Sequence, residues 1–180
     1  MRKLTHDEIA QKRLTLEKVR ESSRIPISVL VDNVRSLYNV GSIFRTSDGA
    51  MIETLILTGF TPRPPRKEID KTALGATQSV PWEYYENPME AVQRIKKQGK
   101  LLCCLELTDS SVPYHSIHRS DFPLCLVIGN EIVGISKNII AECDMAIEIP
   151  MHGIKHSLNV AVAYGIAVYE LARIWRFRKK

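Results

Sequence analysis

Several features that identify common protein classes are missing from this sequence of 180 residues. No apolar run reaches the roughly 20 residues that a membrane-spanning helix needs. The N-terminal stretch MRKLTHDEIAQKRLTLEKVR is charged, whereas a secretory signal peptide has an apolar core. The sequence therefore predicts a cytoplasmic protein with no membrane partner.

Nucleotide and metal motifs are also missing. There is no GxGxxG of a Rossmann dinucleotide site and no GxxxxGK[ST] of a P-loop. His152 and His156 stand four residues apart, which suits a metal on a helix, but Gly153 lies between them in an expected loop. The four cysteines have no CxxC spacing and lie mainly in apolar runs, which favours buried free thiols. We therefore expect no metal site.

The composition is that of one soluble domain with a basic balance. Hydrophobic residues make up 44% and charged residues 25%, and the length suffices for a full core. The net charge of +5 suits a polyanion such as RNA, although two solvated basic ends are the alternative. The cations concentrate at the two ends, in Arg2, Lys3, Lys12, Arg13, Lys18 and Arg20, and in Arg173, Arg176, Arg178, Lys179 and Lys180.

Apolar strand-like segments alternate with helix-like segments along the chain. The expected strands are 27–31, 54–60, 101–107, 124–129 and 145–150. They lack strict apolar and polar alternation, as strands covered on both faces do. The pattern predicts an α/β fold with a mostly parallel sheet and helices on both faces, whose ligands bind beyond the carboxyl ends of the strands.

The N-terminal segment is predicted to be an appendage to this domain. Residues 5–23 read as one charged helix with a weak apolar stripe, which packs on the domain or contacts substrate. We therefore divide the chain into an N-terminal helical extension, 1–24, and a main α/β domain, 25–180.

An internal helix is expected to begin near Asn39, which would cap it. Its inward stripe consists of Val40, Ile43, Phe44 and Ser47. This spacing leaves Arg45 on the opposite side of the helix, where its guanidinium can hold a phosphate or remain a solvated surface group.

The last helix is expected to run from Leu158 to Trp175 and is apolar almost all round, which predicts burial in a core or an interface. Ser157 is the expected N-cap. Asn159 is a polar residue in the first turn, and this stretch alone favours a capping role over a ligand contact.

Three segments, in order, resemble the motifs of one family. They are NVRSLYNVGSIFRTSDGA at 33–50, VIGNEIVGIS at 127–136 and IPMHGIKHSLNVAVAYGIAVYEL at 149–171. They are similar to the motifs of the SpoU family of RNA ribose 2′-O-methyltransferases, in the SPOUT superfamily. The resemblance implies S-adenosyl-L-methionine as cofactor, tRNA or rRNA as substrate, a C-terminal trefoil knot, and a homodimer paired through the knot region and the last helix.

The resemblance also implies site residues. Substrate or catalytic roles fall to Asn39, Arg45, Glu131, Ser157 and Asn159. The cofactor is expected at Leu107, Thr108, Gly129, Ile149, Met151 and Leu158, mainly through backbone atoms. Core packing is the alternative for Ile149 and Leu158, and a loop-ordering ion pair is the alternative for Glu131.

The chemistry leaves one role open. A guanidinium normally stays protonated, so we expect Arg45 to hold the phosphate and ribose, and the acceptor of the hydroxyl proton stays unassigned. The last helix is expected to supply the apolar surface of the dimer interface through Tyr164, Tyr169 and Trp175. The alternative is that these residues only close the core of the monomer.

Two other functions fit the resemblance. One is a knotted RNA-binding module without activity, which would not need the polar set of the three motifs. The other is a SPOUT enzyme that methylates a base nitrogen, which the asparagine of the first motif and the SLN of the third disfavour.

Overall fold

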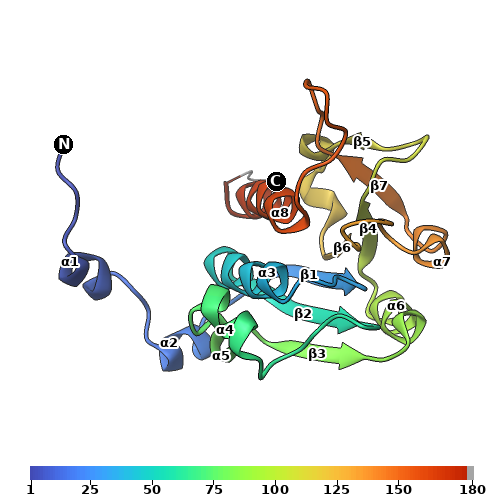
Figure 1. The fold of residues 1–180 in the computed structure, drawn as a ribbon. Coiled ribbons are helices and arrows are strands. Elements are labelled where there is room, and N and C mark those ends of the chain that lie inside the picture. The colour runs from blue at the N-terminus through green and yellow to red at the C-terminus, as the bar shows by residue number, and fades with distance from the viewer. Residues whose placement is uncertain (178–180) are drawn as a thin grey trace.

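The computed structural model describes residues 1–177 and has one seven-stranded sheet at its centre (Figure 1). The strand order is β3-β2-β1-β6-β4-β7-β5, and every neighbouring pair is parallel. The strands are β1 (Ile25–Asp32), β2 (Ile52–Thr58), β3 (Trp82–Tyr85), β4 (Leu101–Leu105), β5 (Val112–Pro113), β6 (Leu124–Ile128) and β7 (Met145–Glu148). The predicted α/β class with a parallel sheet is confirmed. The knot itself stays a prediction.

Helices cover both faces of the sheet, as predicted. They are α1 (His6–Gln11), α2 (Leu16–Glu21), α3 (Leu37–Ala50), α4 (Lys67–Ala73), α5 (Ala76–Ser79), α6 (Pro88–Lys97), α7 (Lys137–Ile140) and α8 (Val160–Phe177), with short 3-10 turns η1 (Tyr114–Ser116) and η2 (Arg119–Asp121). One core contains buried residues of α3, α4 and α8, and the other contains buried residues of α6 and α7.

The central strand β1 explains why two cores form. Its side chains alternate between faces, so Ile27 and Val29 enter the first core and Leu30 enters the second. Buried Phe44 and Tyr164 attach α3 and α8 to the first core, and the Tyr164 hydroxyl lies 2.7 Å from the Ser47 hydroxyl. Because these neighbouring strands are parallel, the carboxyl ends of β1, β4, β6 and β7 lie along one edge of the sheet.

The N-terminal segment differs from the single predicted helix. Thr5 caps α1 with a capping box, and Thr15 accepts from the Lys18 amide to cap α2, so the chain breaks into two short helices. Helix α1 has no buried residue and α2 buries only Val19. Figure 1 shows α1 away from the sheet, joined to the rest of the chain through α2.

The last helix is buried in the core on one side, and its other side is exposed, so the predicted burial in a core is confirmed for one face and the predicted interface stays a prediction. Tyr164 is fully buried and Trp175 packs against Phe122, so both serve the chain's own core. Exposed Val162, Ile166 and Tyr169 form a stripe at helical spacing, with 52%, 36% and 54% of each residue accessible. The last three residues of the predicted basic C-terminal end, Arg178, Lys179 and Lys180, lie outside the described residues.

Cysteine placement agrees with the sequence prediction. Cys103, Cys104 and Cys125 are buried free thiols, and Cys143 is half-buried and free. Burial raises the pKa of Cys125 to about 12, so this thiol stays protonated. Within residues 1–177, no three His, Cys, Asp or Glu side chains come together as metal ligands, and no helix has the length and apolar character needed to cross a membrane.

Candidate active site

A cavity of about 760 Å³ lies where the carboxyl ends of β4, β6 and β7 meet the start of α8. Five of the six predicted cofactor residues line it, namely Leu107, Gly129, Ile149, Met151 and Leu158. Thr108 does not line it, because its amide and carbonyl turn toward the Ser111 hydroxyl in a tight turn. Of the predicted catalytic residues, Glu131, Ser157 and Asn159 line the cavity, whereas Asn39 and Arg45 do not.

The loop after β6 forms one wall of this cavity and closes on itself. Asn130 and Gly134 exchange two backbone hydrogen bonds of 3.0 Å, and the Asn130 side chain accepts from the Ile132 and Val133 amides. A Cβ on Gly129 would lie 2.4 Å from the backbone of both Gly134 and Ile135. Gly129 therefore allows a close backbone approach, but the approaching backbone belongs to this chain.

Two carboxylates hold the far side of the same loop, and sequence reasoning gave neither a role. Asp32 is fully buried and accepts from the Ser136 amide at 2.7 Å and the Ser136 hydroxyl at 2.6 Å. Glu106 accepts from the Ile135 amide at 3.1 Å and lines the cavity. A recognisable signal existed, since each acid ends or follows an apolar strand at the edge where ligands bind.

Glu131 joins the second motif to the first. Its carboxylate accepts from the Arg35 amide at 2.9 Å, the Ser36 amide at 3.0 Å and the Asn39 side-chain nitrogen at 2.8 Å. Partial burial acts to raise the pKa of Glu131, but these hydrogen bonds outweigh it and keep the pKa below its ordinary value. The loop is thus ordered by hydrogen bonds, and the alternative of an ion pair with an arginine does not apply within residues 1–177.

Asn39 and Asn159 connect the first motif to the third. The Asn159 side-chain nitrogen donates to the Asn39 side-chain oxygen at 3.1 Å. Asn39 and Ser157 are the predicted N-caps, and both predictions need correction. Ser36 caps α3, and Asn159 caps α8 by accepting from the Ala161 amide at 2.9 Å. Each cap stands before the residue that begins its helix, so Asn39 is freed to face Glu131 and Asn159. The preferred capping role of Asn159 is confirmed.

Ser157 and Arg45 stand apart from this network. Ser157 is exposed at the cavity wall, and the predicted N-cap role is wrong because α8 begins at Val160. Arg45 is exposed on α3, opposite the buried stripe of Val40, Ile43, Phe44 and Ser47, as predicted. In the described part of the chain its guanidinium has no hydrogen bond or ion pair, so its donors are free for another molecule.

The two roles of Asn159 can be separated by substitution. Asn159→Ala should cost about 1 kcal/mol of unfolding free energy through the lost cap, and should also break the link to Asn39. Asn159→Asp keeps the capping acceptor but cannot donate to Asn39, so we expect near-normal thermal stability with lowered activity. Equal stability losses in the two variants, measured by thermal unfolding, would contradict the capping role.

The cavity wall has donor chemistry suited to S-adenosylmethionine. The cofactor combines an apolar-faced adenine with a positive sulfonium, and the wall combines Ile149 and Leu158 with the carboxylates of Glu106 and Glu148. The loop from Gly129 to Ile135 adds main-chain groups to one side. The residues present therefore fit the cofactor.

The sequence also matches known proteins. The sequence model of the SpoU rRNA Methylase family matches residues 26–169. A tRNA (guanosine(18)-2'-O)-methyltransferase from Aquifex aeolicus is 34% identical over 170 residues, which cover 92% of this chain and 78% of that protein.

Solved structures show the same fold. The A. aeolicus TrmH/SpoU tRNA modifying enzyme superposes with a TM-score of 0.79 at 31% identity, covering 88% of this chain and 81% of that chain. An AdoMet-bound rRNA methyltransferase from Sinorhizobium meliloti superposes with a TM-score of 0.77 at 29% identity, covering 89% of this chain. The alignment spans 61% of the Sinorhizobium chain.

Proposed function

This chain belongs to the SpoU rRNA methylase family, and we propose that it transfers a methyl group from S-adenosyl-L-methionine to a ribose 2′-hydroxyl of tRNA or rRNA. One observation carries the proposal: Glu131, Asn39 and Asn159, one residue from each motif, form a continuous hydrogen-bonded chain beside the cavity. Three segments distant in sequence are thus joined by hydrogen bonds through Asn39.

The cavity beside this hydrogen-bond network would hold the cofactor. When bound, S-adenosylmethionine supplies an electrophilic methyl group on a positive sulfur. Backbone groups near Gly129, Ile149 and Leu158 would bind its adenosine and methionine portions, with Leu107 and Met151 as apolar contacts. Glu106 and Glu148 give this wall the negative charge that favours a cation.

The other side of the network would position the RNA. Methyl transfer would require the ribose oxygen to bond to the methyl carbon while the carbon–sulfur bond breaks with its electron pair going to sulfur, and the hydroxyl proton would pass to a base or to solvent water. Holding the oxygen in line with the methyl group is the main task of the protein. Glu131 fixes the loop of Arg35 and Ser36, Asn39 and Asn159 present amide groups at the mouth, and Arg45 holds the phosphate and ribose.

The proposal includes a homodimer and a cytosolic location. The exposed stripe of Val162, Ile166 and Tyr169 gives α8 an apolar surface outside its own core. A second copy covering this stripe would lie beside Asn159, at the entrance of the site. Sedimentation of the wild type and of a Tyr169→Glu variant tests the dimer.

The function is tested by incubating the protein with methyl-labelled S-adenosylmethionine and unmodified RNA, followed by nuclease digestion and nucleoside identification. A labelled 2′-O-methyl nucleoside is the expected product, and the labelled fraction separates tRNA from rRNA. A methylated base would favour the base-nitrogen alternative. Cofactor binding with no transfer to any RNA would favour the inactive RNA-binding module.

The N-terminal helices are expected to contact RNA. Because α1 buries nothing and α2 buries only Val19, deleting residues 1–22 should leave the cofactor affinity unchanged. The same deletion removes the basic residues of this segment, so RNA affinity should fall and depend less on salt. Filter binding of tRNA at two salt concentrations measures this, and an equal loss of cofactor binding would instead assign the segment a structural role.

A further inference from the structure

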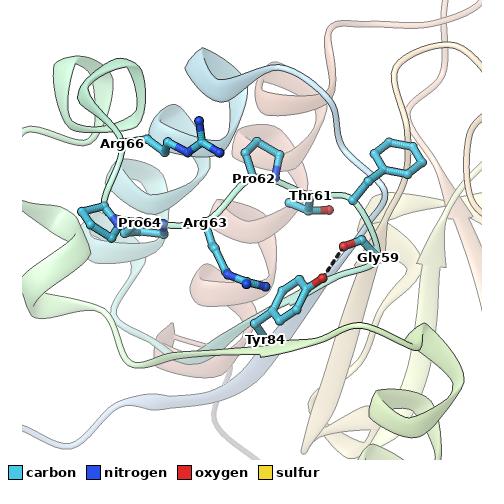
Figure 2. A pocket seen from close by; sticks show the side chains of 9 residues that line it. Gly59, Thr61, Pro62, Arg63, Pro64, Arg66 and Tyr84 are labelled. Atoms are coloured by element: carbon cyan, nitrogen blue, oxygen red, sulfur yellow. Dashed lines mark hydrogen bonds between the residues drawn. The ribbon is translucent and has the colours of Figure 1, made fainter.

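A second cavity, of about 390 Å³, lies beside the loop that follows β2 (Figure 2). Its lining combines an exposed aromatic ring, two arginines and a second ring, namely Phe60, Arg63, Arg66 and Tyr84. We propose that this cavity holds an unpaired nucleotide of the RNA substrate, with its base stacked on Phe60 and its phosphates bound by Arg63 and Arg66. This inference rests on the proposed RNA substrate.

Phe60 is placed as a stacking platform. The residue is 63% exposed, although a phenylalanine ring is normally buried. Its backbone is fixed, because the Phe60 amide donates to the Asn33 side-chain oxygen at 3.1 Å. Gly59 precedes it with φ of +62°, and a Cβ there would lie 2.1 Å from the same Asn33 oxygen. An exposed ring on a fixed backbone loses little conformational freedom when a base stacks on it.

The two arginines supply the charge. The Arg63 guanidinium lies 3.9 Å from the centre of the Tyr84 ring, and the Tyr84 hydroxyl donates to the Gly59 carbonyl at 2.7 Å, as Figure 2 shows. Arg63 is thus held over a ring that is itself tied to the loop. Arg66 extends from the same loop, and both arginines are exposed. Neither has a carboxylate partner within residues 1–177, which leaves both charges available for phosphates.

This cavity is connected to the proposed catalytic network. Thr61 accepts from the Val34 amide at 3.1 Å and donates to the Val31 carbonyl at 3.2 Å. Asn33 also donates to Asp32, the carboxylate that holds Ser136 in the wall of the main cavity. The loop of Phe60 is therefore attached to the first-motif segment whose next amides bind Glu131. A nucleotide bound here would therefore contact a loop that is tied by hydrogen bonds to the network proposed to position the RNA.

The contributions of base stacking and of charge to RNA affinity can be measured separately by fluorescence anisotropy. The probe is a labelled single-stranded RNA of about ten nucleotides, a length within the range of site sizes of proteins that bind single strands. Phe60→Ala should weaken binding roughly 5- to 100-fold without changing its salt dependence. Arg63→Ala and Arg66→Ala should each lower the slope of log affinity against log salt by about 0.7, the value per phosphate of a single strand. Phe60→Trp should bind like the wild type, and RNA should quench the emission that the new tryptophan adds.

Phe177→Ala is the matched control, because Phe177 is another exposed phenylalanine but lies at the far end of α8 from Asn159. It should bind RNA like the wild type. Equal RNA affinity in the Phe60→Ala and Phe177→Ala variants would overturn the stacking site, as would an unquenched Phe60→Trp. Binding needs no turnover, so a wild type that shows Phe60-dependent binding but transfers no methyl group would support this site and contradict the proposed function.

Discussion

Replacing Arg45 with alanine is expected to reduce kcat for methyl transfer by about 100- to 1,000-fold, while the cofactor dissociation constant stays near the wild-type value. The reason is the position of Arg45 on the exposed side of α3, with no partner among the described residues and outside the lining of the cofactor cavity. Its fork of donors is free to bind a phosphate and ribose, and losing them misplaces the nucleophilic oxygen. Single-turnover transfer and calorimetric cofactor binding measure the two quantities.

Two further variants sharpen this prediction. Arg45→Lys keeps the charge but loses the fork, so its activity should lie between those of the wild type and the alanine variant. Lys71→Ala removes an exposed charge from α4, which packs against α3, and should leave kcat unchanged. Wild-type turnover in Arg45→Ala would remove Arg45 from the mechanism, and a loss as large in Lys71→Ala would show that only net charge matters.

Much of the fold could be predicted from the sequence because the strands are short apolar runs between helix signals. β6 comes out almost as the pattern indicates, at 124–128 against the expected 124–129, since LCLVI is an uninterrupted apolar run. The N-terminal segment could not be predicted as well. Its charged sequence supports helix throughout, and only the local caps at Thr5 and Thr15 decide that two helices form.

The site was predicted less completely, because its geometry depends on which of several polar residues ends each helix. Ser36 and Asn39 both suit an N-cap by residue type, as do Ser157 and Asn159. Tertiary hydrogen bonds decide between the first two, since Glu131 binds Asn39 and leaves the cap to Ser36. Asp32 contacts a residue 104 positions away in sequence and Glu106 one 29 positions away, and no local pattern encodes either contact.

Gly129→Ala is expected to weaken cofactor binding at least about tenfold and to lower the unfolding free energy by about 1–3 kcal/mol. The added Cβ would lie 2.4 Å from backbone atoms of Gly134 and Ile135, and backbone cannot rotate away as a flexible side chain can. The loop is also held from behind, because Glu106 binds the Ile135 amide and Asp32 binds Ser136. Relief of the clash must therefore break one of these anchors or displace the end of β6, and either change alters the cavity wall.

The control for this prediction is Gly153→Ala, in the loop before α8. A Cβ on Gly153 meets no atom within 4 Å, and its backbone conformation has no positive φ that would strain an alanine. We expect this variant to keep the wild-type Tm and cofactor affinity, whereas Gly129→Ala should lose roughly 3–10 °C in Tm. If Gly129→Ala instead bound S-adenosylmethionine with wild-type affinity, the loop from Gly129 to Ile135 would not be part of the cofactor site. If both alanine variants lost affinity equally, general flexibility of these loops, and not the close packing at Gly129, would control cofactor binding.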